Sequence, residues 1–187
     1  NYANVGVTGV TDGNLASINA AVKAVGGYST SSAVDSRAKL QTLTDAYLHI
    51  LQGADGTANN LATPISRAEL LAVGVNPAKL PATGNGPATA SLLGTAVDAQ
   101  SATTKVDTPA KLDALADVAA KVVAYAADTA SPLTAAAPTL ADLTTLGVTG
   151  ILPAGAGLAS TLPLVQTAIA ANDPACFVQQ FLGAFDV

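Results

Sequence analysis

The sequence lacks most of the residues on which chemical sites are usually built. Its 187 residues include one cysteine, one histidine, no tryptophan and no methionine, and only 11% of them are charged. A single cysteine excludes an internal disulfide framework, and one histidine with one cysteine leaves too few ligands for a zinc site. The absence of methionine predicts that a leader has been removed or that the sequence is a segment of a longer polypeptide.

Charge is scarce and acidic on balance. Acidic and basic residues number 13 and 8, for a net charge of −5, and the bases are scattered along the chain. With few aromatic rings to stack on bases, this pattern disfavours nucleic-acid binding. An acidic surface without a basic amphipathic helix also disfavours anionic membranes. Residues 143–172 carry no charge, but glycines and prolines interrupt them, so we expect no membrane span.

Helix start and stop signals are abundant. Half of the residues are apolar, and alanine, leucine and valine dominate them, which favours close-packed helices. The fullest signal is a capping box, in which Ser66 begins a helix and Glu69 stands three residues later. Ile65 and Leu70 are placed for a hydrophobic staple, and Gly74 supplies the left-handed residue that ends the helix.

The same signal occurs three times. It returns at Thr139 to Gly150, and Tyr2 to Gly9 matches its second half with the first turn missing. The Gly-Val pair that ends the helix in each copy begins at positions 6, 74 and 147, so the copies are nearly evenly spaced along the chain. A second signal, Val34 to Leu40, returns at a similar interval as Val106 to Leu112. The chain therefore contains an internal repeat.

The predicted fold is all-α and consists of tandem three-helix repeat units with a period of about 70 residues, joined by loops rich in glycine, proline and threonine. We expect repeat 1 at 1–65 with its first helix truncated, repeat 2 at 66–137, and a partial repeat 3 at 138–187. The predicted helices cover residues 12–25, 35–52, 66–73, 89–99, Leu112 to Tyr125, 139–146 and 162–171, with a helical turn at 76–80 and a last helix opening at 172–175.

These segments resemble a known class of repeats. Leu146 to Gly150, Asn14 to Val22 and Val106 to Leu112 are similar to the alanine-rich helical repeats of very large bacterial surface proteins, such as giant adhesins and surface-layer-like proteins. The resemblance implies a secreted, cell-surface location and a scaffolding or adhesive role, and it carries over no catalytic residues. Repeat 2 departs from these repeats because it lacks Thr-Gly after Val75. The loop at 150–161 is also unusual for them.

Catalytic signatures are missing. A Ser-His-Asp arrangement would need His49, but no nucleophile motif accompanies it, and its neighbour Asp45, one turn earlier, predicts a surface contact instead. Without tryptophan and with few tyrosines, the acidic residues have little with which to hold a sugar. The phosphate-loop pattern of a lysine after a glycine-rich turn is also absent. We expect no enzyme activity, no cofactor and no resident metal.

Calcium has a few candidate ligands. Asp12 to Asn14 is explained by helix capping, and Asp55 to Asn60 offers oxygen ligands but lacks the closing glutamate of a helix-loop-helix site. Asp113 and Asp117, on one helix, are an alternative that would bind calcium weakly together with other subunits.

Both ends of the chain are predicted assembly surfaces, and at the first of them Asn1 to Val5 lacks the capping turn of its helix. Phe177, Phe181 and Phe185 would form an exposed aromatic stripe in an isolated molecule. Cys176 could pair between chains or react through a lowered pKa in a first helical turn, but we favour burial as a small apolar residue. The leading hypothesis is a structural protein or domain of an extracellular bacterial layer, filament or giant adhesin that self-associates or contacts neighbouring repeats of a longer chain. The alternative is an α-helical ligand-binding module with a groove between repeats, and it predicts a closed pocket lined by side chains from two repeats.

Overall fold

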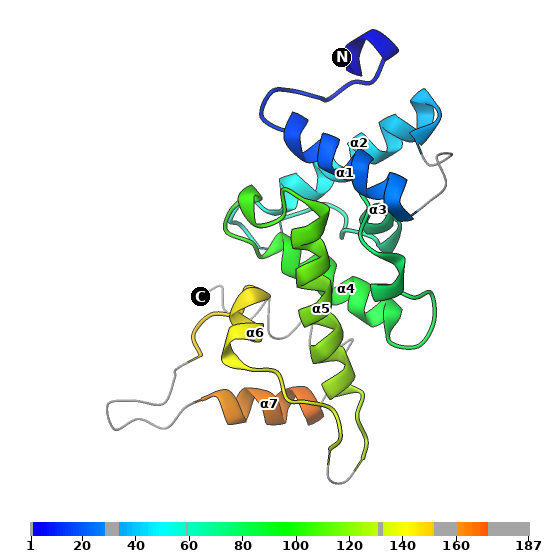
Figure 1. The fold of residues 1–187 in the computed structure, drawn as a ribbon. Helices are drawn as coiled ribbons and strands as arrows, with labels where there is room; N and C mark the ends of the chain where they lie inside the picture. The colour runs from blue at the N-terminus through cyan, green and yellow to red at the C-terminus, as the bar shows by residue number, and fades with distance from the viewer. Residues whose placement is uncertain (1, 29–33, 59, 131–132, 152–160, 172–187) are drawn as a thin grey trace.

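All regular structure in the described chain is helical, which confirms the all-α prediction. The computed structural model describes residues 2–28, 34–58, 60–130, 133–151 and 161–171 (Figure 1). Its elements are the 3-10 helices η1 (Tyr2–Val5), η3 (Pro77–Lys79) and η4 (Thr103–Lys105), and the α-helices α1 (Leu15–Tyr28), α2 (Arg37–Gly53), α3 (Arg67–Ala72), α4 (Gly86–Asp98), α5 (Pro109–Ala126), α6 (Leu140–Thr145) and α7 (Leu162–Ala171).

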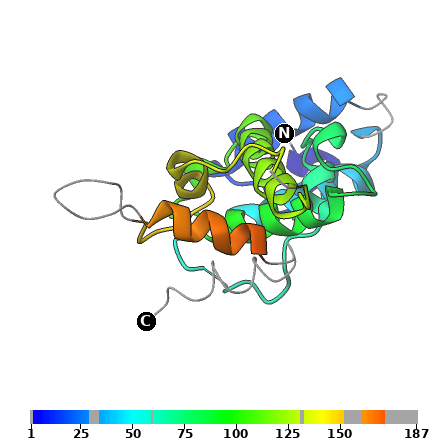
Figure 2. The same ribbon diagram turned by 90° about the horizontal axis from the view of Figure 1, so that it is seen from below.

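The helices follow one another along the molecule. In Figure 1 η1, α1 and α2 lie at one end, α3, α4 and α5 in the middle, and α6 and α7 at the other end. Figure 2 shows the molecule from below, with α7 lying across the end that faces the viewer. Helix α2 packs against α1, α3 and α4, and α5 packs against α4, α6 and α7. A single apolar core extends from Ile18 in α1 to Ile169 in α7.

The start signals at Val34 to Leu40 and at Val106 to Leu112 each contain the beginning of a helix, α2 at Arg37 and α5 at Pro109, and the two beginnings are alike. Ser36 accepts a hydrogen bond from the backbone N–H of Lys39, and Thr108 accepts one from that of Lys111, each at 3.4 Å. Ion pairs one turn apart cover both starts: Asp35 with Lys39 at 2.9 Å, and Asp107 with Lys111 at 2.6 Å. Short polar caps of this kind satisfy the free amides of a first helical turn.

The predicted bounds of α1 were wrong at both ends. The helix begins at Leu15, because the Asn14 side chain turns back to accept the N–H of Thr11 at 2.8 Å and holds residues 11–14 in a separate turn. It then continues through Gly26 and Gly27 to Tyr28. Glycine lowers helix stability without forbidding a helix, so packing against α2 can override the stop signal.

Other predicted elements agree more closely. The bounds of α7 match the prediction, whereas α4 begins three residues earlier than expected, with Pro87 in its first turn. The helical turn after Asn76 is confirmed as η3, and the Asn76 side chain accepts the N–H of Ala78 at 2.9 Å. The helix opening at 172–175 lies outside the described residues. The three-helix repeat itself stays a prediction.

The core is made largely of the predicted apolar faces. In α2, Leu43, Tyr47 and Ile50 are buried as expected, while Leu40 and Leu51 are half-buried. The hydroxyl of Tyr47 donates to the backbone oxygen of Val106 at 3.0 Å, which connects α2 to the segment before α5. Burial, assisted by the nearby Asp107 carboxylate, raises the pKa of Tyr47, so this hydroxyl stays protonated and donating.

Candidate functional site

The contact between α2 and α3 is formed by a histidine and a capping box. Both the N–H and the Oγ of Ser66 donate to Glu69 Oε2, at 2.7 and 2.6 Å, and the Glu69 N–H donates to Ser66 Oγ at 3.2 Å. The other carboxylate oxygen, Oε1, lies 2.7 Å from His49 Nδ1. The expected surface contact of His49 with Asp45 is therefore wrong, because Asp45 accepts from Gln41 and His49 turns to the next helix.

The charge on Glu69 is stabilised in this position. Partial burial alone would raise the pKa of Glu69, but hydrogen bonds from Ser66 and His49 outweigh it and hold that pKa below its ordinary value. The arrangement is not that of a nucleophile with its base, since the carboxylate lies between the serine and the histidine. In this geometry the imidazole cannot take the serine proton, and all three groups serve to hold α3 on α2.

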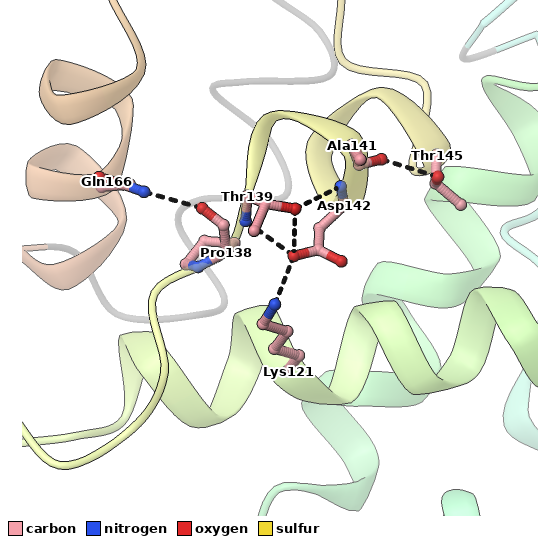
Figure 3. Close-up of polar contacts among 7 residues, drawn as sticks. All are labelled: Lys121, Pro138, Thr139, Ala141, Asp142, Thr145 and Gln166. Carbon is pink, nitrogen blue, oxygen red and sulfur yellow. Dashed lines mark hydrogen bonds and ion pairs between the residues drawn. The ribbon is translucent and has the colours of Figure 1, made fainter.

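The contact between α5 and α6 has the same plan with different residues (Figure 3). Thr139 is the N-cap of α6, and its N–H and Oγ1 donate to Asp142 Oδ2 at 2.7 and 2.8 Å. Lys121, on α5, reaches the same Oδ2 at 2.5 Å. Gln166, on α7, donates to the backbone oxygen of Pro138 at 2.8 Å and so attaches α7 to the segment before the cap.

Asp142 is the centre of this second contact. Partial burial would raise the pKa of Asp142, but hydrogen bonds from Lys121 and Thr139 outweigh it and lower that pKa. We refer below to the two contacts as the first joint (His49, Ser66, Glu69) and the second joint (Lys121, Thr139, Asp142). The capping boxes were predicted, whereas the basic side chains that reach them from the preceding helices were not. One sequence signal could have predicted them, because Lys121 stands one repeat period after His49.

Three glycine turns share one hydrogen-bond pattern. In each, a glycine with positive φ donates to the carbonyl three residues earlier, and the following valine donates to the carbonyl five residues earlier, which is a helix-ending motif. The pairs are Gly6 to Ala3 and Val7 to Tyr2, Gly74 to Leu71 and Val75 to Leu70, and Gly147 to Thr144 and Val148 to Leu143, all at 3.0–3.1 Å.

Two of these turns are attached to a later helix in the same way. After the first turn, the N–H of Thr8 donates to Gln41 Oε1 on α2 at 2.9 Å. After the second turn, the N–H of Asn76 donates to Asp113 Oδ1 on α5 at 2.8 Å. In both cases a side chain one turn inside a helix receives the backbone amide that lies two residues beyond the glycine.

Two open grooves lie beside the joints. The larger, with a volume of about 1200 Å³, lies between the end of α4, the start of α5 and α6. The smaller, with a volume of about 390 Å³, lies between the end of α1, the start of α2 and α3. Corresponding residues contribute to both, for example Lys39 and Lys111, and Gly74 and Gly147. The alternative hypothesis expected a closed pocket, and both grooves are open.

The proposed calcium ligands are engaged with protein groups. Asp55 accepts the Thr57 N–H at 2.8 Å and the Asn60 amide at 2.9 Å, and these bonds lower the pKa of Asp55. Asp113 accepts the N–H of Asn76, as described above. Asp117, on the same helix, pairs with Lys79 at 2.5 Å. Within the described residues, no group of three or more histidine, cysteine or acidic side chains is placed to hold a metal ion.

The predicted assembly surface of Phe177, Phe181 and Phe185 lies outside the described residues, and so does Cys176. The large apolar side chains that are exposed among the described residues include Val5, at the N-terminal end, and Leu164, on α7. None of the described helices combines the length and the apolar character that crossing a membrane requires.

Comparison with known proteins leaves the function to be argued from the structure itself. No family model, no curated protein and no solved structure matches the chain.

Proposed function

We propose that the chain is a tandem array of three-helix units, with a period of about 70 residues, and that it acts as a non-enzymatic structural component of an extracellular bacterial surface layer, filament or giant adhesin. The observation that carries this proposal is that one joint is built twice. A basic side chain from one helix, His49 or Lys121, reaches the carboxylate of a capping box that opens the next, first between α2 and α3 and then between α5 and α6.

The correspondence extends beyond the ion pairs. The interval from His49 to Lys121 is almost the same as the interval from Glu69 to Asp142, and both match the spacing of the glycine turns. The contacts of Thr8 with Gln41 and of Asn76 with Asp113 have corresponding positions in the same register. The helix packing corresponds as well, because α2 contacts the two helices α3 and α4 and α5 contacts the two helices α6 and α7. Contacts that repeat with the sequence period are what an array of like units requires.

A structural role follows from how the polar groups are used. The charged groups of both joints bind one another across helix contacts, and none converges with a nucleophile on a shared cavity. The helices succeed one another along the molecule (Figure 1), and an array in which each unit contacts its neighbours would have this arrangement. The cell-surface location rests on the likeness to alanine-rich surface repeats and on a composition with few charges and one cysteine.

The architecture is tested by adding a unit. A second copy of residues 66–137 is inserted after residue 137, so that the new joint brings Lys121 to the capping box of Ser66 and Glu69 in the inserted copy. An array accepts the extra unit, and we expect helix content to rise in proportion to length, a longer particle in small-angle X-ray scattering, and cooperative unfolding at an equal or higher temperature. As a control, the same residues are inserted in scrambled order.

A protein whose helices form a closed arrangement would lose its fold on this insertion. Unfolding or aggregation of the chain with the extra unit, equal to that of the scrambled control, would therefore refute the array. The surface location is tested separately, by labelling intact cells of the producing bacterium with antibodies raised against the chain. Labelling that requires permeabilised cells would contradict an extracellular role.

The larger groove supports a second candidate function, the ligand-binding module. It is lined by Leu115 and Ala141, among other residues, and its volume of about 1200 Å³ accommodates a small apolar ligand. We expect the dye anilinonaphthalene sulfonate to bind there and Ala141→Trp to block it. Ala68→Trp, in the smaller groove, is the matched control and should leave dye binding unchanged. Absence of dye binding to the unmodified chain would contradict this candidate.

A further inference from the structure

We propose that the N-terminal end of the chain binds the end of α7 of a second copy, so that copies join head to tail. This inference rests on the proposed array. The head surface is defined as Tyr2, Val5 and the turn at Gly6, and the tail surface as the end of α7 at Ala171. The two surfaces lie at opposite ends of the described chain (Figure 1).

Residues that correspond to Val5 are covered elsewhere in the same chain. Val5 immediately precedes the first glycine turn, as Val73 and Leu146 immediately precede the second and third. Val73 and Leu146 are each 0% exposed, whereas Val5 is 54% exposed. The local backbone is the same in all three turns, so the difference lies in what packs against them. At the head surface, an apolar position that is buried twice within the chain faces solvent.

The interior turns show what lies against the glycine that follows this position. A Cβ placed on Gly74 would lie 2.8 Å from the Cβ of Ala24, near the end of α1, and one placed on Gly147 would lie 3.0 Å from that of Ala99, just after α4. Each glycine turn therefore fits closely against an alanine at the end of a helix from the preceding unit. For Gly6 the nearest atoms belong to Arg37, on its own later helix.

Helix α7 offers the matching alanine. It packs against α5 as α4 packs against α2, and its fully buried Ile169 stands two residues before Ala171, as the fully buried Val97 stands two residues before Ala99. Ala99 is in contact with the third glycine turn, while Ala171 is exposed. The end of α7 thus presents the surface that the interior turns use, and the head surface of a second copy is its counterpart.

Head-to-tail binding uses two different surfaces on each copy, and such contacts produce open chains unless the rotation between copies closes a ring. Each copy has one head and one tail, so blocking either surface should leave the other free. This property separates the proposal from non-specific hydrophobic aggregation, in which no single blocked surface would stop growth.

The test uses full-length chains with one surface blocked. Val5→Glu blocks the head and Ala171→Glu blocks the tail, and circular dichroism and thermal unfolding establish that both variants stay folded, since both positions are exposed. By sedimentation equilibrium, the average mass of the unmodified chain should rise with concentration past that of a dimer. Each variant alone should need at least about tenfold higher concentration to associate, because a carboxylate would be buried against an apolar surface.

Mixing gives the decisive result. The head-blocked and tail-blocked variants together retain one intact head and one intact tail, so we expect dimers that contain one of each and no larger species. Ala82→Glu, at an exposed alanine in the middle of the chain, is the matched control and should associate like the unmodified chain. A mixture that stays monomeric, or blocked variants that associate like the unmodified chain, would overturn the proposal.

The two proposals can fail separately. If the chain with the inserted unit folds but the unmodified chain stays monomeric at all concentrations, the array stands and head-to-tail binding is wrong. If the inserted unit prevents folding as the scrambled control does, the array is wrong. The argument that the head and tail surfaces are counterparts then fails too, because it rests on the array.

Discussion

Replacing Gly94 by alanine should destabilise the protein, contrary to the usual effect of that change within a helix. Gly94 lies inside α4, where alanine would ordinarily stabilise by about 0.5–1 kcal/mol. A Cβ at this position would, however, lie 2.6 Å from the backbone oxygen of Ile65, the residue before the capping box of α3. A backbone atom cannot rotate away, so α3 and α4 must separate.

The magnitude follows from these opposing effects. Overpacking of a well-filled contact costs about 1–3 kcal/mol. After subtraction of the helical preference of alanine, we expect Gly94→Ala to lower the free energy of unfolding by roughly 1–2 kcal/mol. The measurement is urea unfolding followed by circular dichroism, with slopes compared to check that the unfolding transition remains the same.

Gly26→Ala is the matched control. Gly26 also lies in a helix, α1, but beyond that helix's own backbone no atom of the described residues is within 4 Å of a Cβ placed there. Only the helical preference then acts, and stability should rise by about 0.5–1 kcal/mol. The reasoning would be refuted if Gly94→Ala were as stable as the unmodified chain or more so, since the close approach of α4 to Ile65 would then not constrain the packing.

Three further predictions concern hydrogen bonds and charge. Tyr47→Phe should lower stability by about 1–2 kcal/mol in urea unfolding, because the buried oxygen of Val106 loses its donor; an unchanged midpoint would contradict this contact. The pKa values of Glu69 and Asp142 are lowered on folding, so their contribution is present above the ordinary carboxyl range and is lost as pH falls through the lowered values. Calorimetry from about pH 6 to about pH 2 should therefore show a falling Tm, and a constant Tm would count against both joints. The N–H groups of Ala135 and other loop residues hold the pKa of Asp128 at about 2, and an NMR titration at or above its ordinary value would disprove that loop geometry.

Local signals in the sequence predicted the ends of most helices well. Ser66 and Thr139 carry their own capping partners three residues away, so neighbouring residues suffice to place α3 and α6. The same logic was wrong at Gly26 and Gly27, because contacts of α1 with other helices outweigh a weak local preference. Helix existence was therefore more predictable than helix length.

The joints were only half predictable. A capping box is a local pattern, but the basic side chain that reaches it comes from another helix, and spacing within α2 pointed His49 to Asp45 instead of Glu69. Comparing the two units position by position, rather than each helix alone, would have paired His49 with Lys121 and found the missing partner. The interpretation of Phe177, Phe181, Phe185 and Cys176 as an assembly surface stays a prediction.

The central claim, that one joint is built twice, is tested most directly by transplanting it. In a single chain, His49→Lys, Ser66→Thr and Glu69→Asp give the first joint the residues of the second. If the joints are equivalent, the free energy of unfolding at neutral pH should stay within about 1 kcal/mol of the original, because the new residues already fit together at the second joint. The control variant carries His49→Glu in place of His49→Lys and should be clearly less stable, since two carboxylates then face each other. A loss of more than about 2 kcal/mol in the transplanted chain, similar to that of the control, would contradict the equivalence of the two joints.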